Sequence, residues 1–325
     1  MTVQDGLLTW IPCPVDRTAV DLLAQTGGVA LGYGENARSW AEVAPHATGV
    51  LLRTAGFSAT DMADAPHLRI IARHGVGYDS VDVEAASRRG IPVTITADAN
   101  SRSVAEHAFA LLLSVARKVP QASSAVRAGN WSTTRGDLTG QELNGRRLGL
   151  LGFGRIARRV AQIARAFDME VLAADPQVSD SDALRAGVTI VSPEELFASS
   201  EVLSLHAPLV PSTRQVINAR TLAVMPRGAI LINTARGGLI DPVGLLSALD
   251  SGHLAGAGLD VLPDEPPVSG DLLVAHERVV VTPHIGGQTE QAMRRVAIEA
   301  ATSVLDAYAD KPLRDVVNSG SLAAV

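Results

Sequence analysis

The chain has 325 residues, of which 46% are apolar and 19% charged, and its net charge at neutral pH is −6. This length suggests about two domains, and the apolar content excludes a disordered chain. Acidic residues outnumber basic ones, so nucleic acid is not an expected partner. The single cysteine, Cys13, excludes an internal disulfide and a cysteine-rich metal site, and we expect no bound metal. No apolar run is long enough to cross a bilayer and the first ten residues do not form a secretory signal, so we expect a cytoplasmic protein without a membrane partner.

Short apolar segments alternate with helical patterns along the first hundred residues. Val50–Leu52, Leu68–Ala72 and Ile91–Ile95 are predicted strands, and Val83–Arg89 is a predicted helix. This alternation is typical of a parallel sheet covered by helices, and therefore of an α/β fold.

Ser103–Val119 has a strong helical pattern. Ser103 is followed three residues later by Glu106, which is the pattern of a capping box, so the helix is expected to begin at Ser103. Its apolar residues cover most of its circumference, which indicates either deep burial or a subunit interface. The segment Gly129–Gly140 that follows is a predicted loop, because Gly, Ser and Thr dominate it.

A second alternating series begins at Arg147. Helices are expected between its strands, including Ile156–Phe167 and Pro242–Ser251, and Thr289–Tyr308 is the last predicted helix. Six strands with intervening helices are what a complete dinucleotide-binding domain requires. The predicted strands are Leu148–Leu151, Glu170–Ala174, Val202–Leu205, Ala229–Asn233, Ala255–Leu259 and Val279–Val281.

The first strand of this series runs into the motif G-x-G-x-x-A. Gly152 permits a tight turn, Gly154 lets the backbone approach a pyrophosphate, and Ala157 lets the following helix pack closely on the strand. The N-terminus of that helix presents free N–H groups and a partial positive charge to phosphates. The motif therefore predicts a dinucleotide site.

Asp175 supports this interpretation and favours NAD over NADP. It ends the second strand, 21 residues after Gly154, where a carboxylate accepts hydrogen bonds from the adenosine ribose. The same carboxylate would repel a 2′-phosphate, and Pro176 and Gln177 offer no arginine in its place.

Three short polar segments each follow a predicted strand and contain Arg236, Glu265 and His284. Ligands of open parallel sheets bind outside the carboxyl ends of the strands, so all three segments should face one crevice. An arginine can bind a carboxylate and polarise the adjacent carbonyl. A histidine can exchange a proton with a forming alkoxide near neutral pH, and a nearby carboxylate stabilises its protonated form. These residue types suit the reduction of a 2-keto acid. The segments are Asn233–Gly238, Asp260–Pro267 and Thr282–Gly287.

With these motifs the chain closely resembles the D-isomer-specific 2-hydroxyacid dehydrogenases, especially their phosphoglycerate dehydrogenase-like branch. The motifs occur in the family order and span most of the chain from Val50 to Val317. The matching stretches are Arg73–Asp82, Asn100–Leu113, Leu148–Ala157, His206–Asn218, Met225–Asp241, Ala255–Val261 and Thr282–Thr289.

The resemblance implies a role for each site residue. Arg236, Glu265 and His284 would be catalytic, with His284 as general acid and base. Asp260 would hold the nicotinamide carboxamide. The backbone amides of Gly75, Val76 and Gly77 would bind the substrate carboxylate as an anion nest, while Arg53 and Thr54 would meet the far end of the substrate. The cofactor, NAD, would be bound by Gly152, Gly154, Arg155, Ile156, Asp175, His206, Pro208, Thr213, Thr234, Ala235, Asp260 and Gly286.

The family architecture implies two Rossmann-like, doubly wound parallel-sheet domains with the active site in the cleft between them. Residues 1–98 and 288–325 would form a discontinuous, flavodoxin-like substrate domain, and residues 99–287 the NAD-binding Rossmann domain. The apolar helix Ser103–Val119 would contribute to a homodimer interface. Because the family resemblance ends near Val317, we expect no regulatory C-terminal domain and no feedback by serine.

Substrate identity stays open among small anionic 2-hydroxy and 2-keto acids, including 3-phosphoglycerate, hydroxypyruvate and glyoxylate, since Arg53 could read a phosphate, a sulfonate or a second carboxylate. Two other functions remain. A phosphite dehydrogenase uses the same scaffold, whereas formate enzymes lack the glutamate that Glu265 provides. A non-enzymatic NAD(H)-sensing protein would keep the cofactor site, although all three catalytic positions are present here.

Overall fold

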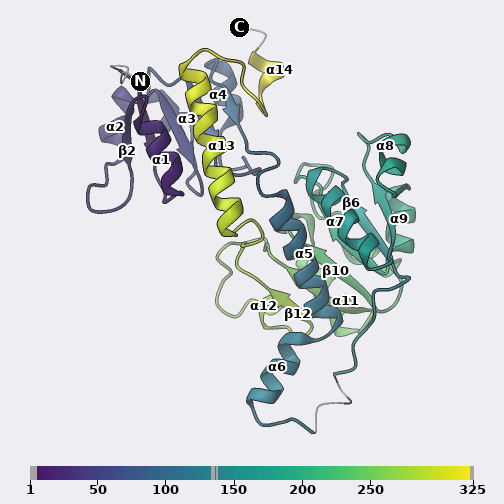
Figure 1. Ribbon diagram of the computed structural model, residues 1–325. Coiled ribbons are helices and arrows are strands. Elements are labelled where there is room, and N and C mark those ends of the chain that lie inside the picture. Colours follow the sequence, from purple (N-terminus) through teal and green to yellow (C-terminus); the bar gives the residue numbers. More distant parts are fainter. Residues whose placement is uncertain (1–5, 133–135, 137, 323–325) are drawn as a thin grey trace. The chain divides into compact units, whose positions relative to one another are not determined.

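The structure, a computed structural model, describes residues 6–132, 136 and 138–322. The chain forms two compact units, one made of Met1–Asn100 with Gln288–Val325 and the other of Ser101–Gly287. The first unit is therefore discontinuous in sequence. Both are α/β units with a parallel sheet (Figure 1).

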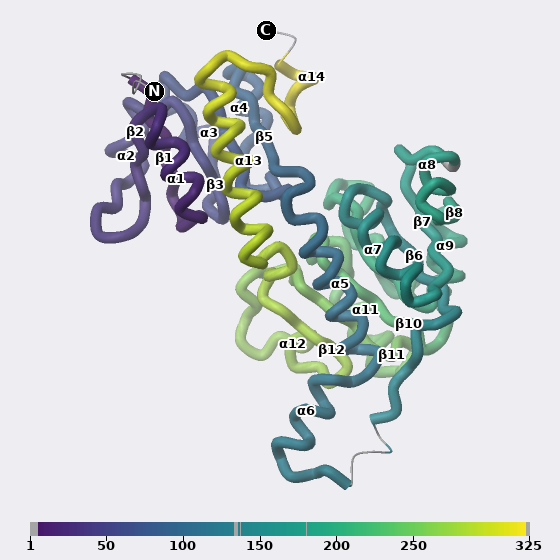
Figure 2. The backbone as a smooth tube through the Cα atoms, viewed as in Figure 1, coloured from purple at the N-terminus to yellow at the C-terminus, as the bar shows by residue number. Residues whose placement is uncertain are grey.

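The first unit contains a five-stranded sheet in the order β2-β1-β3-β4-β5, with every pair parallel. Its helix α13 lies beside α1, as the tube trace shows (Figure 2). The strands are β1 (Leu8–Ile11), β2 (Gly28–Leu31), β3 (Gly49–Leu52), β4 (Ile70–Arg73) and β5 (Val93–Thr94). The helices are α1 (Arg17–Ala24), α2 (Trp40–Val43), α3 (Ala59–Ala63), α4 (Val83–Arg88), α13 (Glu290–Tyr308) and α14 (Ser319–Leu322), with a 3-10 turn at Ala44–His46.

Alternate residues of the central strands point to opposite faces of this sheet, because side chains of a strand alternate with a period of two. Leu51 and Ile70 pack with α1 and α13, whereas Val50 and Ile71 pack with α3 and α4. Burial on both faces explains why β3 and β4 read as continuous apolar runs rather than alternating ones.

The second unit contains a seven-stranded parallel sheet in the order β12-β11-β10-β9-β6-β7-β8. The order reverses between β6 and β9, which is the switch point where open α/β sheets bind ligands. The strands are β6 (Arg147–Leu151), β7 (Glu170–Ala174), β8 (Thr189–Ile190), β9 (Val202–Leu205), β10 (Ala229–Asn233), β11 (Leu254–Leu259) and β12 (Val279–Val281). The helices are α5 (Ser101–Ala116), α6 (Val119–Arg127), α7 (Arg155–Ala166), α8 (Asp180–Arg185), α9 (Pro193–Ser199), α10 (Ala219–Ala223), α11 (Pro242–Asp250) and α12 (Leu272–Ala275), with a 3-10 turn at Gly237–Leu239.

The predicted helix Ser103–Val119 is wrong at both ends. It begins at Ser101, so Ser103 is buried inside the first turn and does not cap it as the capping-box prediction required. It ends at Ala116, because Pro120 lacks an N–H group and its ring would collide with the carbonyl group of Ala116. Lys118 then adopts a left-handed conformation (φ 51°) and α6 starts in a new direction.

Two strands of the first unit, β1 and β2, precede the first predicted strand, Val50–Leu52. The sheet of the second unit has one strand more than the six predicted, the two-residue β8 at its edge. Within the predicted loop Gly129–Gly140, residues 133–135 and 137 lie outside the described part of the chain. No helix among the described residues is long and apolar enough to span a membrane.

Candidate active site

The glycine motif forms the turn between β6 and α7, at the switch point of the sheet. Gly152 has φ +88°, and a Cβ atom there would lie 2.8 Å from the backbone of His206 and Ala207, which follow β9. Only glycine satisfies both constraints. Gly154 is the N-cap of α7 and has no atom within 4 Å of the position of a Cβ. The start of this 12-residue helix, which includes Arg155 and Ile156, is therefore open to an anion.

Asp175 lies beside this turn at the end of β7. Its Oδ2 accepts a hydrogen bond from the N–H of Phe153 (2.8 Å), and its Oδ1 accepts one from the N–H of Gln177 (2.8 Å). Both bonds hold the carboxylate next to the glycine turn, as required of a group that binds the adenosine ribose.

The predicted cofactor residues after β9 and β10 are placed by local hydrogen bonds. His206 Nε2 pairs with Ser204 Oγ (2.9 Å), and burial lowers the pKa of His206 to about 4, so its imidazole is neutral near pH 7. Thr213 Oγ1 donates to the carbonyl oxygen of Pro208 (2.6 Å) and closes the turn after β9. Thr234 Oγ1 is buried without a hydrogen-bond partner in the described chain. This orphaned hydroxyl and the open space at Gly154 fit a bound dinucleotide.

Arg236 follows β10 on a loop that Asn233 holds in shape. The fully buried Asn233 side chain accepts from the N–H of Ala235 (3.0 Å) and donates to the carbonyl oxygen of Arg236 (2.9 Å). The Arg236 guanidinium is half-buried and donates to the carbonyl oxygen of Ala235 (2.7 Å).

The loop after β11 packs directly on this segment. A Cβ atom at Gly237 would overlap the backbone of Leu262 and Pro263, so glycine is required for the contact. The N–H of Leu262 donates to Glu265 Oε1 (3.1 Å), which fixes the orientation of that carboxylate. Arg236 and Glu265 thus lie on two loops that are packed against each other.

His284, which follows β12, pairs with Glu265. Its Nδ1 lies 2.8 Å from Glu265 Oε2. Because a carboxylate accepts hydrogen bonds, Nδ1 carries the proton. Both side chains are exposed, at 53% for His284 and 39% for Glu265, so a small molecule can reach them. The structure thus brings together the three polar segments that follow neighbouring strands β10, β11 and β12.

Asp260, which follows β11, is 2% exposed. Its carboxylate accepts from Thr282 Oγ1 (2.6 Å) and from the N–H groups of Ile285 (2.9 Å) and Gly286 (2.8 Å), and His107 Nε2 lies 3.2 Å away. Burial by itself raises the pKa of Asp260, but these hydrogen bonds outweigh it and hold the pKa below its usual value. Asp260 is therefore a buried carboxylate that organises the loop carrying His284.

In the first unit, the predicted substrate loop follows β4. Gly75 and Thr96 exchange two hydrogen bonds, from the N–H of Gly75 to Thr96 Oγ1 (3.0 Å) and from the N–H of Thr96 to the carbonyl oxygen of Gly75 (3.1 Å). The predicted use of the Gly75 amide for the substrate therefore competes with Thr96. The N–H groups of Val76 and Gly77 have no hydrogen-bond partner among the described residues, so these two remain for an anion.

Arg53 and Thr54 lie on the neighbouring loop after β3. Arg53 donates to the carbonyl oxygen of Pro14 (3.1 Å), and Thr54 Oγ1 lies 3.2 Å from the Sγ of Cys13. The buried Arg73 links the two loops, because it donates to the carbonyl oxygens of Gly77 (2.9 Å) and Ala55 (3.5 Å).

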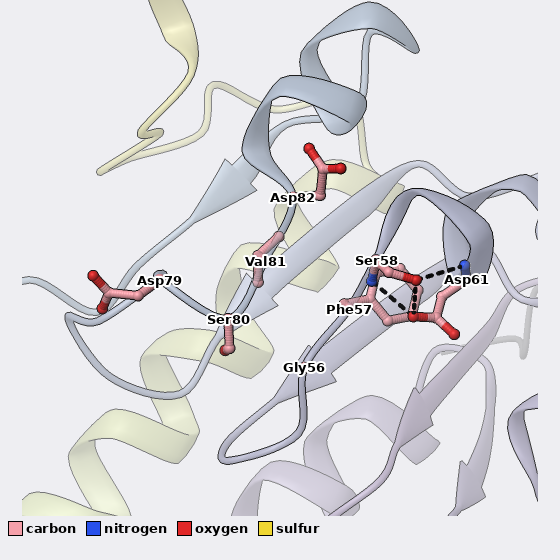
Figure 3. Close-up of a pocket in the computed structure, with 8 residues that line it drawn as sticks. All are labelled: Gly56, Phe57, Ser58, Asp61, Asp79, Ser80, Val81 and Asp82. Atoms are coloured by element: carbon pink, nitrogen blue, oxygen red, sulfur yellow. Dashed lines mark hydrogen bonds between the residues drawn. The ribbon is translucent and has the colours of Figure 1, made fainter. Parts of the chain in front are cut away.

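A separate concavity of the first unit carries carboxylates and does not suit an anionic acid. It is lined by residues of segments 56–61 and 79–82, among them Asp61, Asp79 and Asp82 (Figure 3). Two of these carboxylates cap helices: Asp61 accepts from the N–H and hydroxyl of Ser58, and Asp82 accepts from the N–H of Ala85. The negative charge of these carboxylates distinguishes the concavity from the loop that is predicted to bind the anionic substrate.

Comparison with known proteins identifies the family. The sequence model described as "D-isomer specific 2-hydroxyacid dehydrogenase, NAD binding domain" matches residues 109–286, more than half of the chain. The chain belongs to this family. It is 36% identical over 305 residues (94% of the chain) to a D-3-phosphoglycerate dehydrogenase of Synechocystis sp.. It is 40% identical over 277 residues (85%) to the enzyme of that name from Rattus norvegicus.

Solved structures of the family superpose closely on this chain. A glyoxylate reductase from Paecilomyes thermophila has a TM-score of 0.87 at 30% identity, covering 98% of this chain and 100% of that one. The chain spans about half the length of the curated relatives, 54% of the cyanobacterial protein and 51% of the rat protein.

Residue patterns missed two polar residues that shape the site, Asn233 and His107. Asn233 had a usable signal, since an amide side chain at the end of an apolar strand must bond to the next loop. His107 had none, because a single histidine on an apolar helix is more often part of the core than of a site.

Proposed function

We propose that the chain is an NAD-dependent dehydrogenase of small anionic 2-hydroxy acids, with Arg236, Glu265 and His284 as its catalytic residues. The observation that carries this proposal is the 2.8 Å contact between His284 and Glu265 beside the loop of Arg236. Phosphate binding at α7 alone would suit many nucleotide-binding proteins, whereas an exposed histidine–carboxylate pair suits proton transfer.

In this proposal, Gly152, Gly154, Arg155 and Ile156 hold the pyrophosphate, and Asp175 holds the adenosine ribose. His206, Pro208, Thr213, Thr234 and Ala235 line the crevice, with Asp260 and Gly286 at the nicotinamide end. Asp260 Oδ2 accepts only the bond from Gly286 among the described residues, so it keeps capacity for the carboxamide. When bound, the cofactor supplies or removes the hydride at C2 of the substrate.

The side chains of the protein transfer the proton and bind the charged groups of the substrate. His284 Nε2 gives a proton to the oxygen at C2 during reduction and takes it back during oxidation. Glu265 keeps Nδ1 protonated, fixes the ring and stabilises the imidazolium. Arg236 binds the substrate carboxylate and polarises the carbonyl. Val76 and Gly77, with Gly75, also bind the substrate carboxylate, and Arg53 and Thr54 meet the far substituent.

The names of the relatives favour 3-phosphoglycerate in the oxidation direction, with Arg53 beside its phosphate. Hydroxypyruvate and glyoxylate are smaller acids without a phosphate group for Arg53 to bind. The test is NADH oxidation with phosphohydroxypyruvate, hydroxypyruvate, glyoxylate, oxaloacetate and 3-sulfopyruvate, and NAD reduction with 3-phosphoglycerate, D- and L-hydroxy acids and phosphite.

His284→Ala is the matched control for this test. We expect kcat to fall by about 10²- to 10⁴-fold, while the Kd for NADH, measured by fluorescence, changes by less than about 2-fold. The proposal is supported if the wild-type chain turns over one of the acids and His284→Ala does not. Turnover of phosphite alone, or tight NADH binding without turnover of any acid, contradicts it and favours a phosphite dehydrogenase or an NAD(H) sensor.

A further inference from the structure

His107 on α5 contacts the loop of the catalytic pair although it is not part of it. Its Nε2 lies 2.9 Å from Thr282 Oγ1 and 3.2 Å from Asp260 Oδ1, and the side chain is 18% exposed. Both neighbours belong to the segments that follow β11 and β12. The proposed chemistry at His284 does not use His107, so this contact needs a separate explanation.

The proton positions of this cluster follow from its distances. A threonine hydroxyl has one hydrogen, and Thr282 Oγ1 donates it to Asp260 Oδ1 across 2.6 Å. Thr282 Oγ1 must therefore accept at its contact with His107, so Nε2 of His107 carries a proton. That N–H is shared between the Thr282 oxygen and the Asp260 carboxylate.

Asp260, whose carboxylate is held by His107 and Thr282, in turn binds the backbone around His284. Its two carboxylate oxygens accept from the N–H groups of Ile285 and Gly286, and its carbonyl oxygen accepts from the N–H of His284 (2.9 Å). His284 itself has φ +53°, a left-handed conformation that costs a non-glycine residue about 1 kcal/mol or more. Such a conformation persists only where the surroundings enforce it, and here the bonds to Asp260 do so.

We propose that His107 is a positioning residue for His284. By donating to Thr282 and Asp260 it keeps the Asp260 carboxylate in the orientation that clamps residues 284–286, and so keeps the His284 ring against Glu265. Without this donor, a buried carboxylate loses one of its four hydrogen-bonding partners and gains freedom to rotate. The inference rests on the proposed function, because it assigns His284 as the group to be positioned.

The experiment compares His107→Leu, which removes the donor, with His107→Gln, whose amide N–H can replace it. His276→Leu is the matched control, because His276 is similarly buried (13% exposed) and contacts a different carboxylate, Asp250, at 3.3 Å. With the acid identified above, kcat should fall about 10- to 100-fold in His107→Leu, recover to within about 5-fold in His107→Gln, and stay near wild type in His276→Leu.

The isotope effect separates positioning from lost stability. With 4-deuterated NADH, the primary isotope effect on kcat should rise in His107→Leu, because misplacing His284 slows the chemical step itself. A variant that only lowers the folded fraction would show a lower kcat with an unchanged isotope effect. That result, or an equal loss in His276→Leu, overturns the proposal.

A second measurement needs no substrate. Hydrogen exchange of the Ile285 and Gly286 amides, followed by NMR, should accelerate at least about tenfold in His107→Leu and return toward wild type in His107→Gln. Unchanged exchange in His107→Leu overturns the positioning role. If the wild-type chain turns over no acid while exchange responds as expected, the proposed function fails and the clamp by His107 stands.

Discussion

We propose two tasks for the Asp175 carboxylate. It accepts from the N–H of Phe153 and so braces the glycine turn, and in the proposed function its charge also disfavours a 2′-phosphate at the adenosine ribose. The two tasks are separable by substitution, since asparagine retains an acceptor but carries no charge.

We therefore predict that Asp175→Ala weakens NADH binding by about tenfold, because both the ribose contact and the brace are lost. Asp175→Asn should lose less NADH affinity than Asp175→Ala. It should shift the cofactor preference toward NADPH by at least as much as Asp175→Ala does. Fluorescence titration of both cofactors measures this, with the exposed Asp21→Ala as control. An unchanged preference in both variants would refute the assignment of Asp175 to the ribose.

His74, between β4 and the substrate loop, is a buried histidine without a partner at Nε2 in the described chain. Burial, and then the positive charges of Arg53 and Arg73, lower the pKa of His74 to about 4. The unfolded chain binds this proton at about pH 6.5. Between these two pH values the unfolded state binds more protons than the folded state. His74 therefore does not lower the free energy of unfolding above about pH 6.5, but it lowers it progressively as the pH falls from 6.5 toward 4.

At about pH 5 this cost should be about 2 kcal/mol. His74→Gln cannot take up the proton, so its free energy of unfolding should fall less than that of the wild type between about pH 7.5 and pH 5. Urea denaturation at the two pH values measures the difference. An equal loss in both proteins would show that His74 is not the group that titrates.

At the scale of elements, the turn from β6 to α7 depends on two glycines for different reasons. Gly152 meets the backbone of residues 206–207 and has a positive φ, whereas Gly154 faces open space at φ −77°. The fold needs the first glycine, and we propose that the bound cofactor needs the second.

This contrast predicts opposite outcomes for two alanine variants. Gly152→Ala should destabilise the protein by about 1–3 kcal/mol even without ligand, because the new methyl group strains the turn and displaces the end of β9. Gly154→Ala should leave the free energy of unfolding within about 0.5 kcal/mol but weaken NADH binding at least tenfold, because the methyl group blocks the approach of the phosphates. Thermal unfolding and NADH titration of both variants test the pair, and reversed outcomes would contradict it.

At the scale of the whole molecule, the two units have separate cores. The clusters around β6–β12 contain only residues from Ser101–Gly287, and those around β1–β5 only residues from the other unit. The homodimer implied by the resemblance stays a prediction.

Helix α6 has no buried residue, and its Val119 and Val126 are about half exposed.

We predict that the fragment 101–287 folds on its own and binds NADH with the affinity of the full chain within about tenfold, but does not turn over the acid, since it lacks Val76 and Gly77. Circular dichroism with urea denaturation and NADH fluorescence test this, with the same fragment carrying Gly154→Ala as the binding control. A fragment without a cooperative unfolding transition would show that its core is not self-sufficient.

Local residue pattern determined much of this protein. Apolar runs such as Glu170–Ala174 and Val202–Leu205 predicted their strands with the correct bounds, because burial on both faces of a parallel sheet requires continuous apolar sequence. The position of Arg236, Glu265 and His284 after three successive strands predicted that their segments meet, since the carboxyl ends of parallel strands share one edge.

Tertiary structure decided what local pattern does not encode. The availability of the Gly75 amide depended on Thr96, 21 residues away. The contact of His107 with Thr282 joins residues 175 apart in sequence. The loop that His107 contacts is set by how α5 packs on the sheet, and that packing is a property of the assembled core.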